Sequence, residues 1–227
     1  MNLNRPINLF LFHGGTQTST EFTTNLNSVT NEFLKFPENF NAIIPQAKTM
    51  PYTARKGELK HIWFDRVRNT INEPENLEGM DETCEDLIKN HPQLLDEKLI
   101  LGGYSMGGSL ALYLGLKFLP EHFGVRPLKI FTMSSYLNRN SLVYAEKTGQ
   151  DKILRTPIYM CHAKNDPIVP FSSGQETFDL LKKAGFKNLS FRTNNSYHFF
   201  DEQQLIDVKR FCLLIYKKKM LLKQFNL

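Results

Sequence analysis

The sequence predicts an α/β protein whose central sheet is mostly parallel and carries helices on both faces. Short apolar runs alternate along the chain with segments of helical periodicity, and some runs, such as 99–101 and 158–160, are apolar at every position. Continuous apolar character is typical of strands buried on both faces, and strands joined through helices pair in parallel. The 227 residues, 41% hydrophobic and 22% charged, suit one domain spanning residues 1–227.

The first half of the chain is expected to hold three strands and two helices. The strands are the apolar runs 7–12, 41–45 and 98–104. Apolar side chains recur at helical spacing in 21–35, at Phe22, Leu26, Val29 and Phe33, and again in 77–90. The stretch between them, residues 50–77, is expected to be irregular because it contains prolines and a glycine.

The second half continues the alternation of strand and helix. The expected strands are 128–133, 157–162 and 189–193, and the expected helices are 105–117, 174–184 and 201–216. Gly185 is expected to end the second of these helices. Asp201 is expected to be the N-cap of the last one.

One motif in the middle of the chain carries chemistry. The segment Gly103-Tyr104-Ser105-Met106-Gly107 matches G-x-S-x-G, follows an expected strand and opens an expected helix, as a nucleophile elbow requires. Such a turn crowds the positions two before and two after the serine, where glycine fits because it has no Cβ. The Ser105 hydroxyl is then held at the amino end of a helix, which stabilises negative charge.

A nucleophilic serine needs a base and an acid that orients the base. Elbow enzymes of this topology place these groups later in the chain, in the order Ser, Asp or Glu, His. Asp166 lies just past the expected strand 157–162, and His198 lies in the loop after the expected strand 189–193. Functional groups collect at the carboxyl ends of parallel strands, so Ser105, Asp166 and His198 are predicted to be the catalytic residues.

Other titratable residues have simpler explanations. Asp201 is expected to cap a helix rather than to orient the base, and Asp151 lies at the wrong end of a strand. His162 is expected to be a packed, structural histidine. Three further histidines are expected to be solvated in loops or at helix ends: His61, His91 and His122. No residues have metal-ligand spacing, so no metal site is expected, and catalysis by a serine, a histidine and an aspartate needs no organic cofactor.

Acyl transfer also needs donors for the oxyanion that forms. One should be the backbone N–H of Met106, the residue after the nucleophile. The other should come from the loop His13-Gly14-Gly15-Thr16 after the first strand, where two glycines let the backbone approach the substrate closely, and we choose Gly15. The alternative is a simple Gly-Gly turn.

Taken together, these segments resemble the acyl-protein thioesterase/lysophospholipase family of α/β-hydrolases, also called the phospholipase/carboxylesterase family. The resemblance covers nearly all of the chain and includes HGGT at 13–16, WFD at 63–65, GYSMGG at 103–108, DPIVP at 166–170 and YH at 197–198. Segments 52–53, 56–57, 62–66 and 134–138 resemble the lysophospholipase-like members in particular.

The resemblance implies an α/β-hydrolase without a large lid that cleaves acyl thioesters, notably palmitoyl-cysteine on proteins, or carboxylic esters. It assigns the catalytic roles to Ser105, Asp166 and His198. One departure concerns the first loop, which usually reads HGLGDTG and here reads HGGTQTS, so Gly15 replaces a bulky residue. We expect Trp63 and Phe64 to form an apolar wall of the substrate pocket; the alternative is that both pack into the core beneath the loop.

Two other functions stay open at this point. One is a short-chain carboxylesterase with no protein substrate. The other is a non-catalytic binding protein with an α/β-hydrolase fold, against which the intact set of three residues argues.

Charge and cysteine content bear on partners and location. Lys+Arg exceeds Asp+Glu by 28 − 23 = 5, and lysines gather in the last eleven residues, at Lys217, Lys218, Lys219 and Lys223. The remaining chain is nearly neutral, so no nucleic acid is expected as a partner. The basic tail would either contact a membrane surface transiently or form a solvated helix end.

No apolar run is long enough to cross a membrane. Three widely spaced cysteines and no export signal predict a cytoplasmic protein.

Overall fold

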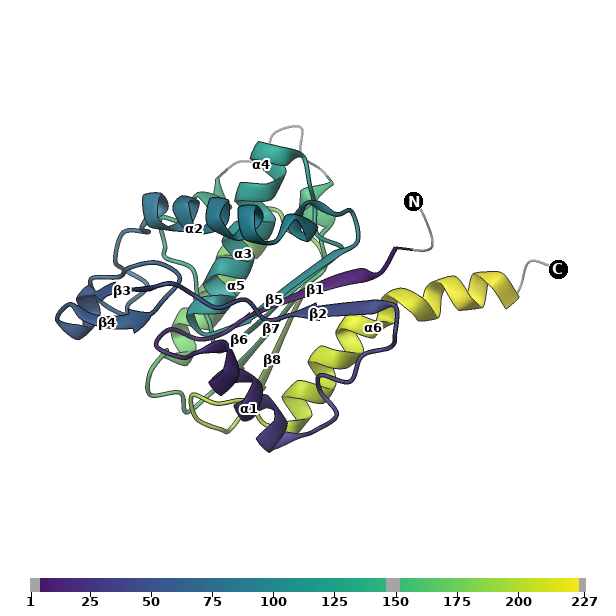
Figure 1. Ribbon diagram of the computed structural model, residues 1–227, viewed down its shortest axis with the longest axis horizontal. Coiled ribbons are helices and arrows are strands. Elements are labelled where there is room, and N and C mark those ends of the chain that lie inside the picture. Colours follow the sequence, from purple (N-terminus) through teal and green to yellow (C-terminus); the bar gives the residue numbers. More distant parts are fainter. Residues whose placement is uncertain (1–4, 146–151, 225–227) are drawn as a thin grey trace.

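Six parallel strands form the central sheet, in the order β2-β1-β5-β6-β7-β8 (Figure 1). The computed structural model describes residues 5–145 and 152–224, with side chains up to residue 214 in the last helix. The strands of this sheet are β1 (Ile7–Phe12), β2 (Phe40–Ile43), β5 (Leu99–Tyr104), β6 (Lys129–Met133), β7 (Ile158–Ala163) and β8 (Leu189–Asn194). The chain passes from β1 outward to β2 and then returns to the other side of β1, which makes the boundary between β1 and β5 a topological switch point.

Helices cover both faces of the sheet, as the sequence predicts (Figure 1). Helices α1 (Ser19–Val29) and α6 (Glu202–Gln224) lie on one face, and α2 (Leu77–Asn90), α3 (Met106–Tyr113) and α5 (Phe171–Lys183) lie on the other. Successive side chains of β1 point to opposite faces, so Leu9 and Leu11 join the cluster under α1 and α6, whereas Phe10 and Phe12 join the cluster under α3. Both faces of the sheet are therefore buried.

The first helix is shorter than its apolar spacing suggests. A capping box formed by Thr18 and Glu21 begins α1, but the helix ends at Val29 rather than continuing to residue 35. The Thr30 side chain accepts a hydrogen bond from the backbone N–H of Glu32 at 3.2 Å, a local bond that competes with helix formation. Phe33 still reaches the core, at 1% exposure, but it does so from a turn.

The segment expected to be irregular contains an antiparallel hairpin. Strands β3 (Thr49–Tyr52) and β4 (Glu58–His61) pair with each other outside the main sheet. Lys56 and Gly57, both with positive φ, turn the chain between them. The prediction was wrong here because four-residue strands containing a proline give almost no periodic signal.

The helix after Ser105 also runs further than predicted. Helix α3 passes through a π-helical turn, η3 (Leu114–Phe118), into α4 (Leu119–Phe123), which ends at Gly124. Pro120 cannot donate to a carbonyl one turn earlier, and the π turn lets a new helical segment begin so that the proline falls in its first turn. Short 3-10 turns complete the described structure: η1 (Thr53–Arg55), η2 (Pro92–Leu95), η4 (Leu142–Tyr144) and η5 (Ile153–Arg155).

The last helix, α6, begins at the cap that the sequence predicts but is longer than predicted. Asp201 Oδ1 accepts from the backbone N–H of Gln204 at 2.8 Å, which confirms Asp201 as the N-cap of α6. The backbone of α6 continues to Gln224, beyond the predicted end at residue 216. The expectation about the basic tail concerns side chains that lie outside the described part of the chain.

Candidate active site

Ser105 occupies a strained turn between β5 and α3. Its backbone has φ 52° and ψ −119°, and its N–H donates to the carbonyl of Met133 at 2.8 Å. A Cβ on Gly103 would lie 2.2 Å from the carbonyl oxygen of Gly107, and a Cβ on Gly107 would lie 2.2 Å from that of Phe12. These backbone contacts leave no room for a side chain, so the two glycines of the motif are a steric requirement of this turn.

The structure brings the three predicted residues together in a chain of hydrogen bonds. His198 Nε2 lies 3.1 Å from Ser105 Oγ, and His198 Nδ1 lies 2.7 Å from Asp166 Oδ2. Each residue follows the carboxyl end of a strand: Ser105 follows β5, Asp166 follows β7 and His198 follows β8. The Tyr104 hydroxyl helps to fix the position of His198, because it donates a hydrogen bond of 2.8 Å to the backbone carbonyl of His198.

Asp166 is held as a carboxylate. Its side chain is buried, which by itself would raise its pKa, but hydrogen bonds from His198, Val169 and Ile168 outweigh burial and hold the pKa below its usual value. The two backbone N–H groups donate to Oδ1 at 2.8 and 2.9 Å, and Oδ2 is left to face the imidazole. The ionised carboxylate can therefore orient His198 and stabilise its cation.

The loop after β1 is held in place by His13, which is fully buried. His13 Nε2 accepts from the N–H of Ala47 at 3.0 Å, so Nδ1 carries the proton and donates to the Gly14 carbonyl at 2.8 Å. The carbonyl and the N–H of a trans peptide point in opposite directions, so the N–H of Gly15 points away from His13. Within the described residues, the N–H groups of Gly15 and Met106 have no hydrogen-bond acceptor.

The other titratable residues lie outside this relay. His162 is buried and its Nε2 donates to the Val169 carbonyl at 2.9 Å, 3.5 Å from Asp166, and burial lowers its pKa. This is the arrangement expected of a structural histidine that supports the aspartate loop. His122 is exposed as expected, whereas His61 and His91 are half-buried; Asp151 lies outside the described residues.

A groove of about 530 Å³ surrounds Ser105 and His198. Its lining comes from the loop after β1, the β3–β4 hairpin and the segment that follows it, and the loops carrying Asp166 and His198. Three exposed apolar side chains, Val67, Ile168 and Phe199, form part of its rim. The hairpin that the sequence did not reveal is thus one wall of the site.

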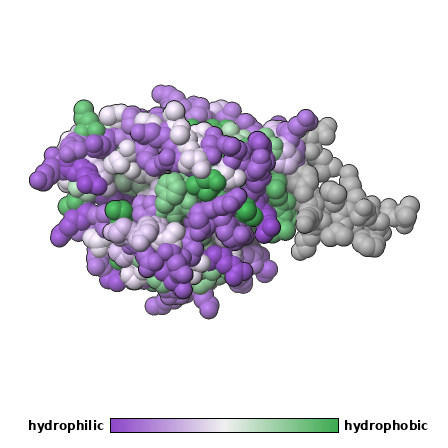
Figure 2. Space-filling view, turned by 90° about the horizontal axis from the view of Figure 1, so that it is seen from below, coloured by the Kyte–Doolittle hydropathy of each residue, from purple (hydrophilic) through white to green (hydrophobic). Residues whose placement is uncertain are grey.

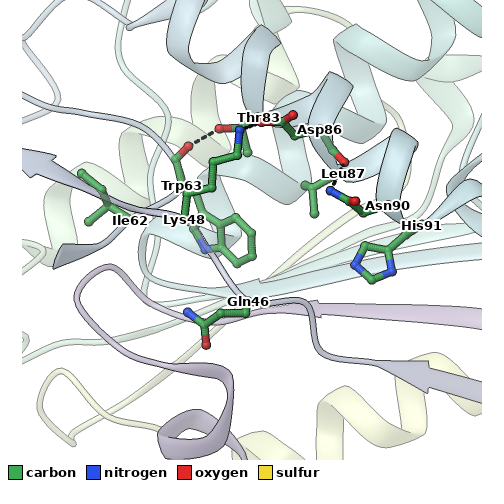
Figure 3. Close-up of a pocket in the computed structure, with 9 residues that line it drawn as sticks. All are labelled: Gln46, Lys48, Ile62, Trp63, Thr83, Asp86, Leu87, Asn90 and His91. Carbon is green, nitrogen blue, oxygen red and sulfur yellow. Dashed lines mark hydrogen bonds and ion pairs between the residues drawn. The ribbon is translucent and has the colours of Figure 1, made fainter.

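Trp63 and Phe64 are not among the residues that line this groove, so the expectation that they form its wall is corrected. Both are 2% exposed, and the Trp63 indole N–H donates to the His13 carbonyl at 2.8 Å. Trp63 instead lines a separate pocket of about 70 Å³ between the β3 segment and α2, together with His91 and the Lys48–Asp86 ion pair (Figure 3). The alternative stated above, packing beneath the loop, describes both residues.

Two residues of the site escaped the sequence reasoning. Tyr104 is adjacent to the nucleophile, yet its contact with His198, with ring centroids 5.1 Å apart, joins segments 94 positions apart. Arg66 enters the groove from the segment expected to be irregular. A signal for Arg66 was present in the segment 62–66, which carried part of the resemblance, but nothing local indicated its position.

A parallel sheet with a strained serine at its switch point, bonded to a histidine and through it to an aspartate, defines an α/β-hydrolase. Comparison with known proteins narrows the class. The model of the phospholipase/carboxylesterase family matches residues 7–215, so the chain belongs to that family. Membership in this family makes it a hydrolase that acts on ester or thioester bonds.

Individual relatives agree with this family. Lysophospholipase-like protein 1 of Mus musculus is 30% identical over 214 residues, which cover 90% of this chain and 85% of the mouse protein. Acyl-protein thioesterase 1 of Debaryomyces hansenii is 31% identical over 205 residues, which cover 83% of this chain and 82% of the yeast protein. The crystal structure of Zea mays acyl-protein thioesterase 2 superposes with a TM-score of 0.77 at 26% identity and covers 92% of this chain and 94% of the maize chain.

The described residues contain neither a metal-binding cluster nor a membrane-spanning helix. Across residues 5–145 and 152–214, no group of three or more His, Cys, Asp or Glu side chains could hold a metal ion. Nor does that part of the chain contain a helix with the length and apolar character needed to span a bilayer.

Proposed function

We propose that the protein cleaves acyl esters or thioesters through an acyl-enzyme formed on Ser105. His198 takes the proton from the Ser105 hydroxyl as its oxygen attacks the carbonyl, and donates it to the leaving thiol or alcohol as that bond breaks. A water molecule, deprotonated by the same histidine, then attacks the acyl-enzyme, which releases the acid and restores Ser105. Asp166 orients the imidazole and stabilises its cation. The observation that carries this proposal is the continuous relay from Ser105 Oγ to Asp166, with contacts of 3.1 and 2.7 Å.

The N–H groups of Gly15 and Met106 serve as the oxyanion donors in this proposal. Both belong to segments that meet at the groove, and a Cβ on Gly15 would lie only 3.1 Å from the Met106 side chain. Each donor of this kind contributes about 3 kcal/mol to the stabilisation of the transition state. No metal or organic cofactor is required by this mechanism.

The substrate proposed first is an S-acylated protein, from which the enzyme would remove the acyl chain. The support comes from the relatives named acyl-protein thioesterase and from the apolar rim of the groove, where an acyl chain could lie. The partner would then be an acylated protein, met transiently at a membrane surface.

A short-chain carboxylesterase is the second candidate, favoured by a specific observation. Trp63 and Phe64 are packed beneath the loop and offer no apolar wall, while three arginines line the groove. A lining of this kind gives less burial to a long acyl chain, in which each methylene contributes up to ~0.8 kcal/mol.

A chain-length series tests both candidates. We would measure kcat/KM for acetyl, butyryl, octanoyl and palmitoyl thioesters, together with a palmitoyl-cysteine peptide, in the wild-type protein and in Ser105→Ala. Turnover should fall to background in the variant with an unchanged melting temperature. A rise of kcat/KM with chain length supports the thioesterase, and a fall supports the short-chain esterase. Normal turnover by folded Ser105→Ala would contradict the proposal.

We place the protein in the cytoplasm. The cysteines Cys84, Cys161 and Cys212 are all buried and unpaired, as in proteins of reducing compartments. Burial raises the pKa of the Cys212 thiol to about 12, so this cysteine is an inert core residue. Imaging of a tagged full-length protein together with its fractionation would test this location.

A further inference from the structure

The charged side chains that line the groove beside Ser105 are all cationic. Arg55, Arg66 and Arg68 contribute to its wall, and no Asp or Glu is among the described residues that line it. On the face that Figure 2 shows, hydrophilic residues predominate and hydrophobic ones form only small patches. The groove is therefore a locally positive site on a molecule with a modest net charge of +5.

Arg66 differs from the other two arginines because its guanidinium is fixed. The guanidinium carbon lies 4.8 Å from the ring centroids of both Phe64 and Tyr136, so the cation packs against two aromatic rings. Its Nη2 donates to Ser109 Oγ at 2.9 Å, and its Nη1 lies 3.4 Å from Asn69 Oδ1. Arg66 therefore has a defined position in the groove rather than a flexible one.

This fixed cation forms no ion pair within the described part of the chain, although its charge opposes the rise that burial causes in the pKa of Glu75. The oxygens that Arg66 contacts belong to uncharged side chains, and its Nε is buried without a hydrogen bond. By contrast, Arg68 forms an ion pair with Glu73 at 2.9 Å. A partly buried charge is costly unless an opposite charge compensates it, so an anion that enters the groove beside Arg66 would be stabilised by its charge.

The position of Arg66 places this charge close to the nucleophile. Ser109, which accepts from Arg66, lies in the first turns of α3, and its backbone N–H lies 3.4 Å from the Ser105 carbonyl. One helical turn, about 5.4 Å of rise, therefore separates the anchoring point of the guanidinium from the elbow. An anionic group a few bonds from the scissile carbonyl would lie within reach of it.

We infer that Arg66, with Arg55 at the groove edge, selects substrates that carry an anionic group, a carboxylate or a phosphate, near the scissile ester or thioester. This inference rests on the proposed function of Ser105. The guanidinium is permanently charged, and carboxylate and phosphate oxygens are the acceptors that bind such a cation most strongly. Arg66 is thus a specificity-determining residue.

The competing explanation is that Arg66 only braces the loops around Tyr136, Asn69 and Ser109. A brace would affect every substrate alike, whereas a specificity residue would affect charged substrates more. The test therefore measures a ratio of two kcat/KM values, in which a general loss of activity cancels.

Two matched pairs of substrates supply the ratio. In the first pair the charge is on the acyl side: p-nitrophenyl hydrogen glutarate against its methyl ester. In the second pair it is on the leaving group: 4-carboxyphenyl acetate against its methyl ester. For each pair, the ratio of charged to neutral kcat/KM is compared between the wild-type protein and Arg66→Gln, so intrinsic differences in reactivity also cancel.

We expect Arg66→Gln to lower the ratio about tenfold or more in at least one pair, as is typical for a lost charge-assisted hydrogen bond. Arg66→Lys should retain part of the ratio, and Arg55→Gln should lower it less. Arg126→Gln is the matched control, because Arg126 is exposed in the loop before β6, at the opposite end of the sheet. The pair that responds shows whether the anion belongs to the acyl or the leaving side.

Salt dependence in the wild-type protein keeps the test valid if Arg66→Gln fails to fold. Raising the ionic strength should lower kcat/KM for the charged member of the responding pair more than for its neutral partner. Equal ratios in all variants together with equal salt dependence would overturn the inference while leaving the proposed function intact. Absence of Ser105-dependent hydrolysis of the neutral esters would instead overturn the proposed function.

Discussion

At the scale of single residues, two aspartates close to His198 have different roles, and Asp166 is the one that binds its imidazole. Three hydrogen bonds hold the pKa of this buried carboxyl below its usual value, so it stays ionised and accepts a hydrogen bond from Nδ1 of His198. Asp201, which lies only three residues after His198, uses its carboxylate to cap α6. The two aspartates therefore give opposite expectations for mutation.

We expect Asp166→Asn to reduce kcat by roughly 10⁴-fold, because the amide would favour the wrong tautomer of His198. Asp201→Ala should instead cost about 1 kcal/mol of stability through the lost helix cap, without a comparable loss of rate. Steady-state kinetics on p-nitrophenyl acetate and urea unfolding distinguish the two effects. Near-normal turnover in Asp166→Asn, with a large loss in Asp201→Ala, would show that Asp201 orients the base.

His13 makes stability depend on pH. Burial lowers its pKa from 6.5 to about 4, although its hydrogen bond with Gly14 opposes the shift. In the unfolded chain the imidazole binds a proton below about pH 6.5, whereas in the folded protein it stays neutral down to about pH 4. The unfolded state binds more protons in this window, so the stabilisation from a neutral His13 is complete above pH 6.5 and decreases toward pH 4.

We therefore expect the wild-type protein to lose about 3 kcal/mol more than His13→Gln as the pH falls from 7 to 4. The free energy of unfolding, measured in urea at several pH values, gives this difference directly. Contributions from other groups, such as His162, are shared by both proteins and cancel. Parallel pH profiles would show that His13 is not held neutral by burial.

At the scale of secondary-structure elements, the elbow depends on backbone packing between β1, β5 and the start of α3. Gly107 faces the Phe12 carbonyl of β1, and that backbone cannot move without disturbing the centre of the sheet. We expect Gly107→Ala to destabilise the protein by about 3 kcal/mol or more, at the upper end of overpacking effects. Thermal and urea unfolding measure this loss.

Gly79→Ala provides a matched control in the first turn of α2. A Cβ there would meet only the Asn76 side chain, at 2.7 Å, and that side chain can rotate away at the expense of its cap. Its effect should stay near 1 kcal/mol. If both variants lose the same small amount, the elbow is not sterically constrained in the way described.

The same scale explains which features the sequence could predict. The bounds of α2 (Leu77–Asn90) were predicted to the residue and those of α5 to within three residues, because burial on one face leaves a repeating pattern. The ends of α1 and α6 were missed by six and eight residues, because a local cap and the length of the last helix leave no such pattern. The motif around Ser105 carries its own steric signature, so the three residues of the relay could be found from sequence. The hairpin β3–β4 could not, because its strands are short and exposed.

Tertiary contacts account for the remaining differences. Trp63 looks like a pocket residue in a polar stretch, but its indole bonds to the carbonyl of His13, which lies 50 positions away. Arg66 lies in the same stretch, and its role depends on rings and hydroxyls from distant segments, such as Tyr136. No local pattern encodes either arrangement.

At the scale of the whole molecule, two hydrophobic clusters pack against opposite faces of the same sheet. Side chains of β1 and β5 belong to both clusters, so neither face can open without exposing the other. We propose on this ground that residues 1–227 unfold as one cooperative unit. Calorimetry should give equal calorimetric and van't Hoff enthalpies, of about 160 kcal/mol near 60 °C for 227 residues. Two separate transitions would contradict a single domain.

The proposed nucleophile can be tested most directly by covalent labelling. A fluorophosphonate reacts with a serine that a histidine activates, and peptide mass spectrometry then locates the adduct. We expect one adduct on Ser105 in the wild-type protein, much slower labelling in His198→Gln and no adduct in folded Ser105→Ala. An adduct on another residue, or unlabelled wild-type protein that still hydrolyses esters, would contradict the account.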